Sequence, residues 1–259
     1  MTMTEEVRDY NRELWNRLVD QGNRWTIPVS AEEVAAARQG KWDIVLTAQK
    51  PVPKEWFPGL EGCRVLCLAS GGGQQAPILA AAGAEVTVLD GSTRQLEQDR
   101  FVAQRDALTI QTIEGDMADL SMFEDESFDL VFHPVSNFCV PDVLPIWSES
   151  FRVLRKGGVL LVGIVNPFTY LFDQDLWDEG IFHVKYAIPH SDAASLSQED
   201  KDRFVKEGFL FEHSHSLTDQ IGGQLEAGFV LTALYEDGDD NEPLSKYMPL
   251  FIATRAVKP

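Results

Sequence analysis

Residues 65–75 read VLCLASGGGQQ, an apolar run short enough for a buried strand that breaks into three consecutive glycines. A helical pattern over residues 74–82 follows and ends at Gly83. A strand, a glycine turn and a helix in this order present backbone N–H groups at the carboxyl edge of an α/β sheet. Glycine lets the backbone pass close to a ligand with unusual φ values. The stretch therefore predicts an α/β sheet with a ligand at this turn.

A second strand-like run, residues 84–89, leads into Asp90, which lies nineteen residues after Gly71. A carboxylate in this place can accept hydrogen bonds from both hydroxyls of a ribose. The residues from Ser92 to Gln95 form a capping-box pattern, so Asp90 and Gly91 fall in the turn between strand and helix. An ordinary turn aspartate would have the same local sequence, but the upstream glycines favour ribose binding. The pair of motifs predicts a nucleoside cofactor.

Two families use such a turn. Residues 71–76, GGGQQA, satisfy the dinucleotide pattern G-x-G-x-x-G/A. The same residues resemble the first motif of the class I S-adenosylmethionine-dependent methyltransferases, in which an apolar strand enters an acidic-x-G-x-G-x-G turn. The first motif alone does not separate the two families.

Three later segments favour the methyltransferases. Residues 113–118, IEGDMA, resemble the segment that receives the adenine in that family, and residues 127–132, SFDLVF, resemble its fourth strand. Residues 151–162, FRVLRKGGVLLV, resemble the following helix, turn and fifth strand. Together with the first motif they cover roughly residues 60–166 in the family's order.

The chain departs from the family pattern inside the first motif. Cys67 stands where the family usually has an acidic residue, and Ala69 and Ser70 replace a common Gly-Cys pair. The acidic residue normally helps to hold the methionine part of the cofactor. Another group must therefore perform that role here.

The resemblance implies a doubly wound, Rossmann-like α/β fold of seven strands, with an antiparallel last strand. Residues 1–59 are predicted to form an N-terminal helical extension that covers the cofactor, and residues 60–259 to form the methyltransferase domain. Residues 166–215 are an insertion after the fifth strand, rich in aromatic residues such as Trp177 and Tyr186. Ordinary connections are much shorter, so we expect a substrate cover here. The acidic residues 236–242 are expected to form a solvated turn before the last strand.

The resemblance also assigns candidate residues to the cofactor site. Asp116 is a possible acceptor for the adenine amino group, and Met117 a compliant apolar wall for the ring. The predicted cofactor-binding residues are Ala69, Ser70, Gly71, Gly72, Gly73, Gln74, Asp90, Gly91, Asp116, Met117 and His133.

No side chain is a convincing catalytic residue. His133, His213 and His215 are weak candidates, and each could equally be a structural histidine. His213 and His215 are expected on one face of a strand, because residues two apart in a strand face the same side. We predict no metal site, since a third ligand is not evident near these two histidines.

The predicted activity is methyl transfer from S-adenosyl-L-methionine to a small-molecule acceptor, most similar to the ubiquinone- and menaquinone-biosynthesis methyltransferases. One alternative is an NAD(P)-dependent oxidoreductase with the same glycine turn. Another is a non-catalytic S-adenosylmethionine-binding protein, which the loss of the acidic residue at Cys67 suggests.

The composition limits the kinds of partner and the cellular compartment that we expect for this protein. The formal net charge of −19 opposes binding to nucleic acid, whose phosphates would be repelled. No apolar stretch approaches the roughly 18 residues of a membrane span, and the first residues lack the pattern of a signal peptide. Three cysteines leave one unpaired in any disulfide scheme, which indicates a reducing cytoplasm. A homo-oligomer is compatible with the sequence.

Overall fold

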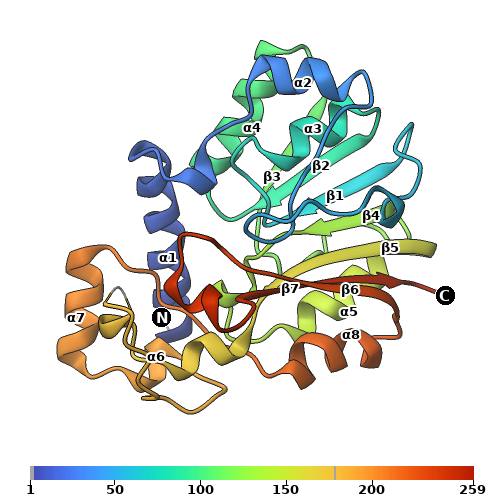
Figure 1. Ribbon diagram of the computed structural model, residues 1–259. Helices are drawn as coiled ribbons and strands as arrows, with labels where there is room; N and C mark the ends of the chain where they lie inside the picture. The colour runs from blue at the N-terminus through green and yellow to red at the C-terminus, as the bar shows by residue number, and fades with distance from the viewer. Residues whose placement is uncertain (1–2, 178) are drawn as a thin grey trace.

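The computed structural model describes residues 3–177 and 179–259, and within these residues seven strands form one sheet with helices on both faces (Figure 1). The strand order is β3-β2-β1-β4-β5-β7-β6, and β7 runs antiparallel to both of its neighbours. The strands are β1 (Arg64–Leu68), β2 (Glu85–Asp90), β3 (Ile110–Glu114), β4 (Phe128–His133), β5 (Leu154–Val165), β6 (Val230–Asp237) and β7 (Phe251–Val257). The predicted doubly wound fold with an antiparallel last strand is confirmed.

Strand β1 lies at the centre of the fold and is buried on both faces. Val65 and Cys67 belong to one core cluster, whereas Leu66 and Leu68 belong to the cluster on the opposite face. This follows from the two-residue period of a strand and explains why the run is continuously apolar. Parallel neighbours β2 and β4 hold β1 in register, with Val65 opposite Val86 and Leu130.

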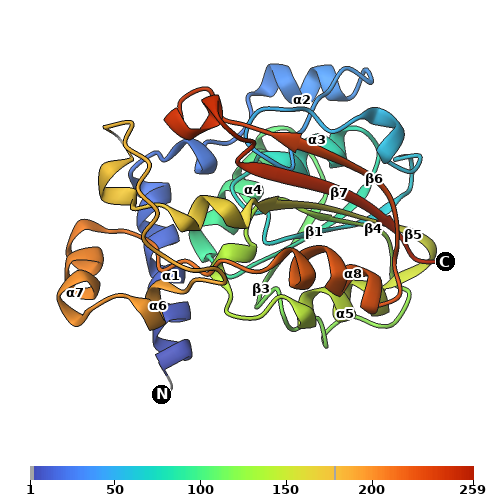
Figure 2. The ribbon, with the colours of Figure 1, turned by 60° about the horizontal axis from the view of Figure 1, so that its bottom comes forward.

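The helices divide between the two faces of the sheet (Figures 1 and 2). Helices α2, α3 and α4 cover one face and α5 and α8 cover the other, where a π-helical segment, Thr218–Gly222, leads into α8. The helices are α1 (Met3–Asp20), α2 (Ala31–Ala37), α3 (Gln75–Ala81), α4 (Thr93–Arg105), α5 (Leu144–Val153), α6 (Asp192–Ser195), α7 (Gln198–Glu207) and α8 (Gly223–Glu226). In the described ranges, no helix has the length and apolar character needed to cross a membrane.

Helix α1 lies away from the sheet faces, beside α6 and α7 (Figures 1 and 2). The Asn11 amide donates to the carbonyl of Phe211 at 2.7 Å, and the Phe211 N–H donates back to Asn11 Oδ1 at 3.0 Å. The Tyr10 hydroxyl donates to the carbonyl of Phe209 at 3.1 Å. The N-terminal helix and the insertion after β5 therefore form one layer at the carboxyl edge of the sheet.

Two carboxylates of the acidic segment 236–242 are not solvated as its composition predicts, whereas Glu236, Asp240 and Asn241 are exposed. Asp237 accepts hydrogen bonds from the Thr47 hydroxyl at 2.7 Å and from the backbone N–H of Lys50 at 2.9 Å. Asp239 is 1% exposed and forms an ion pair with Arg24. The expectation was wrong because these carboxylates anchor the N-terminal extension, whose residues are distant in the sequence.

The segment that contains His213 and His215 is also not a strand. It makes one isolated bridge, between Ser191 and His213, and the N–H of His213 donates to the carbonyl of Phe138 at 2.8 Å. Its backbone partners thus belong to several irregular segments, which explains why the two-residue pattern misled the prediction.

Gly163 of β5 lies against the backbone of the N-terminal extension. A Cβ at this position would lie 2.0 Å from the carbonyl oxygen of Leu46. We expect Gly163→Ala to lower the free energy of unfolding by about 1–3 kcal/mol, because residues 44–48 would have to move away from β5. Urea denaturation measures the change. Gly59→Ala is the matched control, since nothing lies within 4 Å of its Cβ position; an equal loss in both variants would contradict the explanation.

Candidate active site

A cavity of about 1280 Å³ lies at the carboxyl ends of the parallel strands. Its walls include Ala69 after β1, Asp90 of β2, Gly115 after β3, Pro134 after β4 and Val165 of β5. This edge is where open α/β sheets bind ligands. Pockets for one small molecule measure roughly 300–1,000 Å³, so this cavity has room for a cofactor and an acceptor together.

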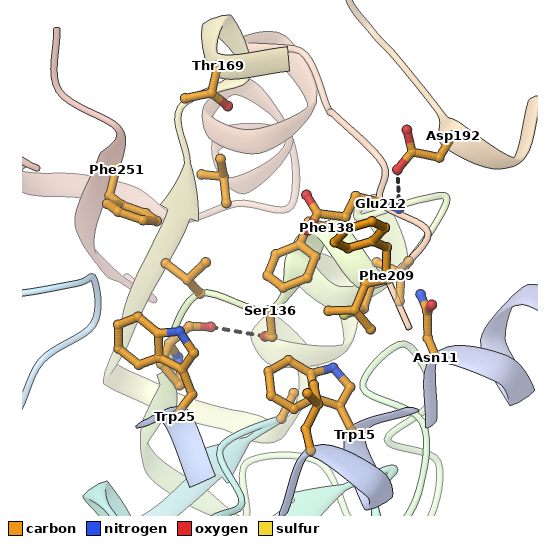
Figure 3. A pocket seen from close by; sticks show the side chains of 18 of the residues that line it. Asn11, Trp15, Trp25, Ser136, Phe138, Thr169, Asp192, Phe209, Glu212 and Phe251 are labelled. Carbon is orange, nitrogen blue, oxygen red and sulfur yellow. Dashed lines mark hydrogen bonds between the residues drawn. The ribbon is translucent and has the colours of Figure 1, made fainter. Parts of the chain in front are cut away.

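The opposite wall comes from the N-terminal extension and from the insertion after β5. Figure 3 shows Trp15 and Trp25 on one side of the pocket, and Phe138, Phe209 and Glu212 on another. We call this part, lined by α1, Trp25, Phe138 and residues 169–212, the cover half, and the part around the strand ends the cofactor half. The predicted insertion contributes aromatic and charged side chains to the same cavity as the glycine turn.

The three glycines of the turn have different surroundings. Gly71 lines the cavity, and its N–H donates to Asp90 Oδ2 at 2.9 Å. Gly72 has a φ of 109°, and a Cβ there would lie 2.8 Å from Gln95 Oε1. A Cβ on Gly73 would lie 3.0 Å from the carbonyl oxygen of Gln98. Gly72 and Gly73 therefore pack against α4 rather than facing the ligand, and glycine is required there by φ and by packing.

Asp90 is positioned by backbone donors at the end of β2. Besides the Gly71 N–H, the N–H of Ser92 donates to its Oδ1 at 2.8 Å. Ser92 caps α4 by accepting from the N–H of Gln95, but the second half of the expected capping box is replaced by the bond to Asp90. Burial raises the pKa of Asp90, and the two backbone bonds oppose that effect. The carboxylate remains at the cavity wall with lone pairs free for a ligand.

The predicted adenine contacts lie at the same edge. Asp116 accepts from the N–H of Ala118 at 2.9 Å and forms an ion pair with Arg8 of α1 at 3.3 Å. Met117 lines the cavity and packs against the adjoining core cluster. Asp116 is therefore already paired with a side chain of α1, and Met117 forms an apolar part of the cavity wall.

Ser70, Gln74 and Gly91 complete the predicted residues that line the cavity. The Gln74 amide donates to the carbonyls of Arg24 and Ile27, each at 3.0 Å, which ties the glycine turn to the N-terminal extension. Ala69 has a φ of 47°, in the left-handed region that favours glycine. Its N–H donates to the carbonyl of Leu89 at 2.7 Å, so the tight turn after β1 is held by β2.

The comparisons with known proteins agree with this geometry. Residues 66–162 match the family model described as a methyltransferase domain. The chain is 49% identical over 249 residues to the "Uncharacterized methyltransferase YbaJ" of Bacillus subtilis (strain 168), an alignment that covers 96% of this chain and 97% of that protein. The chain belongs to the class I S-adenosylmethionine-dependent methyltransferases.

Two further comparisons give more distant similarities of this methyltransferase, one in sequence and one in structure. It is 34% identical over 112 residues to a ubiquinone biosynthesis O-methyltransferase of Actinobacillus pleuropneumoniae serotype 7, covering 42% of this chain and 48% of that protein. A putative S-adenosylmethionine-dependent methyltransferase structure from Listeria monocytogenes has a TM-score of 0.59 at 18% identity, covering 87% of this chain and 99% of that one, which shows the shared fold. S-adenosylmethionine is the cofactor of this family, and the oxidoreductase and non-catalytic alternatives gain no support.

Cys67 is completely buried in β1 of this methyltransferase, in the place of the family's acidic residue. Asp99 of α4 is also completely buried, and its oxygens face the N–H groups of Gly72 and Gly73 without an ordinary hydrogen bond to any described residue. Burial, reinforced by the negative charge of Asp90, raises the pKa of Asp99 well above its usual range. A carboxyl group of α4, whose burial disfavours the charged form, therefore stands behind the glycine turn.

His133 lies at the end of β4 but is fully buried and is not part of the cavity wall formed by the described residues. Its Nδ1 is 2.8 Å from the carbonyl of Leu68, so this nitrogen must be the donor. Its Nε2 contacts the side-chain amide of Asn137, which also bonds Gln220. Burial lowers the pKa of His133 and so disfavours its charged form, and the Asn137 amide donates to Gln220 Oε1 at 2.9 Å. Both nitrogens have structural partners.

His213 and His215 are likewise buried behind the cavity wall. Burial lowers the pKa of His213 to about 4, with a further contribution from His215. His215 Nε2 lies 3.1 Å from the carbonyl of Asn137. In the part of the chain that the structure describes, no group of three His, Cys, Asp or Glu side chains could hold a metal ion.

The polar centre of the cover half was not predicted from the sequence. Glu212 and Tyr170 both line the cavity, and the Tyr170 hydroxyl donates to Glu212 Oε2 at 2.7 Å. The local signal was a single acid, Glu212, that follows the apolar residues 209–211 directly. Trp15 and Trp25 of the N-terminal extension were not predicted as cavity residues either.

Proposed function

We propose that this methyltransferase transfers a methyl group to a small-molecule acceptor bound in the cover half of the cavity. The observation that supports the proposal is the single cavity itself, which joins Asp90 and the glycine turn to an enclosure of aromatic and acidic side chains. An acceptor in the cover half would have direct access to a cofactor in the other half. The partial match to a ubiquinone biosynthesis O-methyltransferase is compatible with a ring-bearing acceptor.

In this proposal Asp90 accepts from the ribose hydroxyls, and Asp116 and Met117 contact the adenine. Ala69, Ser70, Gly71, Gln74 and Gly91 line the remainder of the cofactor half. Gly72 and Gly73 act by shaping the turn. His133 supports the strand ends from behind and has no direct contact with the cofactor.

Bound S-adenosylmethionine supplies a methyl group that is already activated as a sulfonium. The protein's task is therefore to hold the acceptor nucleophile in line with the methyl group and to exclude water. The cover half suits this task, because Trp15, Trp25 and Phe138 border the space above the strand ends. A base is needed only where the acceptor loses a proton.

Calorimetry with S-adenosylhomocysteine and with NAD tests the cofactor assignment. We expect binding of the first and no measurable binding of the second. Incorporation of label from methyl-labelled cofactor into metabolite extracts then tests for transfer. Cofactor binding without labelling of any acceptor would contradict the proposed activity.

The cover itself gives a separate prediction. Trp177 and Tyr186 line the cavity, so replacing both with alanine should lower acceptor turnover at least tenfold while S-adenosylhomocysteine affinity changes less than twofold. Phe168→Ala is the control, because Phe168 belongs to the same insertion but is 45% exposed outside the cavity. Melting temperature is measured in parallel; a loss of stability without a specific loss of turnover would show that the two aromatics only support the fold.

The proposal also covers partners and location. The net charge of −19 favours a small molecule over nucleic acid as the acceptor. Cys63, Cys67 and Cys139 are free thiols, which suits the reducing cytoplasm. Light scattering of the purified protein measures the number of subunits.

A further inference from the structure

Glu212 occupies a distinctive place in the cover half of the cavity. Its backbone N–H donates to Asp192 Oδ2 at 2.8 Å, and Asp192 donates its own N–H back to the Glu212 carbonyl at 3.0 Å (Figure 3). Asn11 fixes the neighbouring residue, Phe211, through two hydrogen bonds. The backbone of Glu212 is therefore held by Asp192 and, through Phe211, by Asn11. Its side chain lines the cavity and accepts a hydrogen bond from the Tyr170 hydroxyl.

The charges around the cover half leave Glu212 without a cationic partner among the described residues. The lysine and arginine side chains that line this half are each paired with another acid: Lys185 with Asp173 at 3.0 Å, Arg203 with Asp175 at 2.9 Å, Arg8 with Asp116 at 3.3 Å and Arg12 with Asp9 at 3.5 Å. The imidazole of His190 contacts Asp192 at 2.9 Å. Glu212 is held by the neutral hydroxyl of Tyr170. A ligand group that donates a hydrogen bond, or carries positive charge, would complete this site.

Four titratable groups face Glu212 from the elements packed around it. Tyr170 comes from the 3₁₀ helix Pro167–Leu171, Asp192 and His190 from the start of α6 and the residues before it, and Cys139 from the 3₁₀ helix Asn137–Cys139. Helix α1 contributes the uncharged Asn11 nearby. Burial raises the pKa of Glu212 to about 7, and the Tyr170 hydrogen bond works in the opposite direction. The carboxyl group can thus exchange a proton near neutral pH.

We propose that Glu212 binds the protic group of the acceptor and takes its proton, so that the acceptor carries an O–H or N–H nucleophile on an apolar or aromatic body. This inference rests on the proposed methyl transfer. The oxygen or nitrogen forms its bond to the methyl carbon and releases its proton to the Glu212 carboxylate, while the electron pair of the broken carbon–sulfur bond stays on sulfur. The rings of Phe138, Phe209 and Tyr170 supply apolar surface for the body of the acceptor.

Three probes of one shape test the site in the full-length protein saturated with S-adenosylhomocysteine. At pH 8 we expect benzylamine and benzyl alcohol to bind more tightly than benzoate, whose charge repels the carboxylate. Glu212→Gln keeps the acceptor for Tyr170 but should weaken benzylamine binding by about 10- to 100-fold and strengthen benzoate binding.

Glu207→Gln is the matched control, because Glu207 is an exposed acid of the same insertion, at the end of α7. It should change each probe's dissociation constant less than twofold. Neither variant should change the dissociation constant of S-adenosylhomocysteine more than twofold. Equal affinity of the parent protein and Glu212→Gln for benzylamine and benzyl alcohol, or no binding of either to the parent, would overturn the proposal. Failure of the parent to bind S-adenosylhomocysteine would instead contradict the proposed function.

The pH dependence separates a proton acceptor from a structural residue. Benzylamine stays cationic from pH 5 to 8, so its affinity for the parent should rise with pH and level off above about 7, as Glu212 ionises. Tyr170→Phe removes the hydroxyl that favours the carboxylate and should move this midpoint to higher pH. Glu212→Gln should abolish the midpoint. A midpoint that persists in Glu212→Gln would assign the titration to another group and refute the role of Glu212.

Discussion

Replacing Asp90 with alanine is expected to weaken S-adenosylhomocysteine binding by at least about 100-fold. The proposed ribose contacts are two charge-assisted hydrogen bonds, each worth about 1.5–3 kcal/mol. The substitution also removes the acceptor for the N–H groups of Gly71 and Ser92, so the glycine turn loses its anchor on β2. Calorimetry measures the affinity, and thermal melting reports whether the variant is folded.

Two further variants are measured in this experiment: Asp90→Asn as an intermediate substitution and Glu97→Ala as the control. Asparagine retains one acceptor oxygen without the charge, so its affinity should fall between those of the parent and the alanine variant. Glu97 is an exposed acid on α4, paired with Arg94, and its loss should leave affinity unchanged. Binding of the Asp90→Ala variant within twofold of the parent would show that the ribose assignment is wrong.

Trp147→Ala should cause the largest loss of stability, about 3–5 kcal/mol. The indole of this α5 residue is completely buried, and its Nε1 donates to the carbonyl of Asp219 at 2.9 Å. A Cβ on Gly223 of α8 would lie 2.7 Å from the ring, which shows how closely α5 and α8 approach here. Truncation would leave a large void and an unpaired carbonyl.

Urea denaturation of the parent and the Trp147→Ala variant measures this loss. Tyr247→Ala is the comparison, because that ring is 74% exposed and its removal should cost less than about 0.5 kcal/mol. A loss for Trp147→Ala below about 1 kcal/mol would mean that α8 collapses into the space at little cost.

The sequence predicts the sheet well because its signals are local. The apolar strand, the glycine turn and Asp90 lie within residues 64–90, and the structure brings Gly71 and Asp90 into direct contact. The seven strands and the antiparallel β7 followed from the family resemblance, and the structure confirms them. What the local pattern could not tell is which glycine lines the cavity: Gly71 does so, whereas a Cβ on Gly72 would meet Gln95.

The cover half could not be predicted because its contacts join distant residues. Tyr170 and Glu212 are 42 positions apart, and nothing in either local sequence indicates that they meet. Asp239 has the sequence environment of a solvated turn, yet it is buried because Arg24 comes to it from 215 positions away. The burial of His133, His213 and His215 could not be predicted either, because it depends on irregular segments that meet only in the folded chain.

The hydrogen bonds between Asn11 and Phe211 join positions 200 residues apart, and this has a consequence for the order in which the chain acquires its structure. Helix α1 leaves the ribosome well before the segment that it contacts, because that segment lies 200 positions later in the chain. At about 5–20 residues per second, α1 waits roughly 10–40 s for its partner. Buried side chains of α1 such as Leu14 stay uncovered during that time. Strands β1 to β5 can therefore assemble around an open cavity, and the roof of that cavity closes only after the segment around Phe211 has been made.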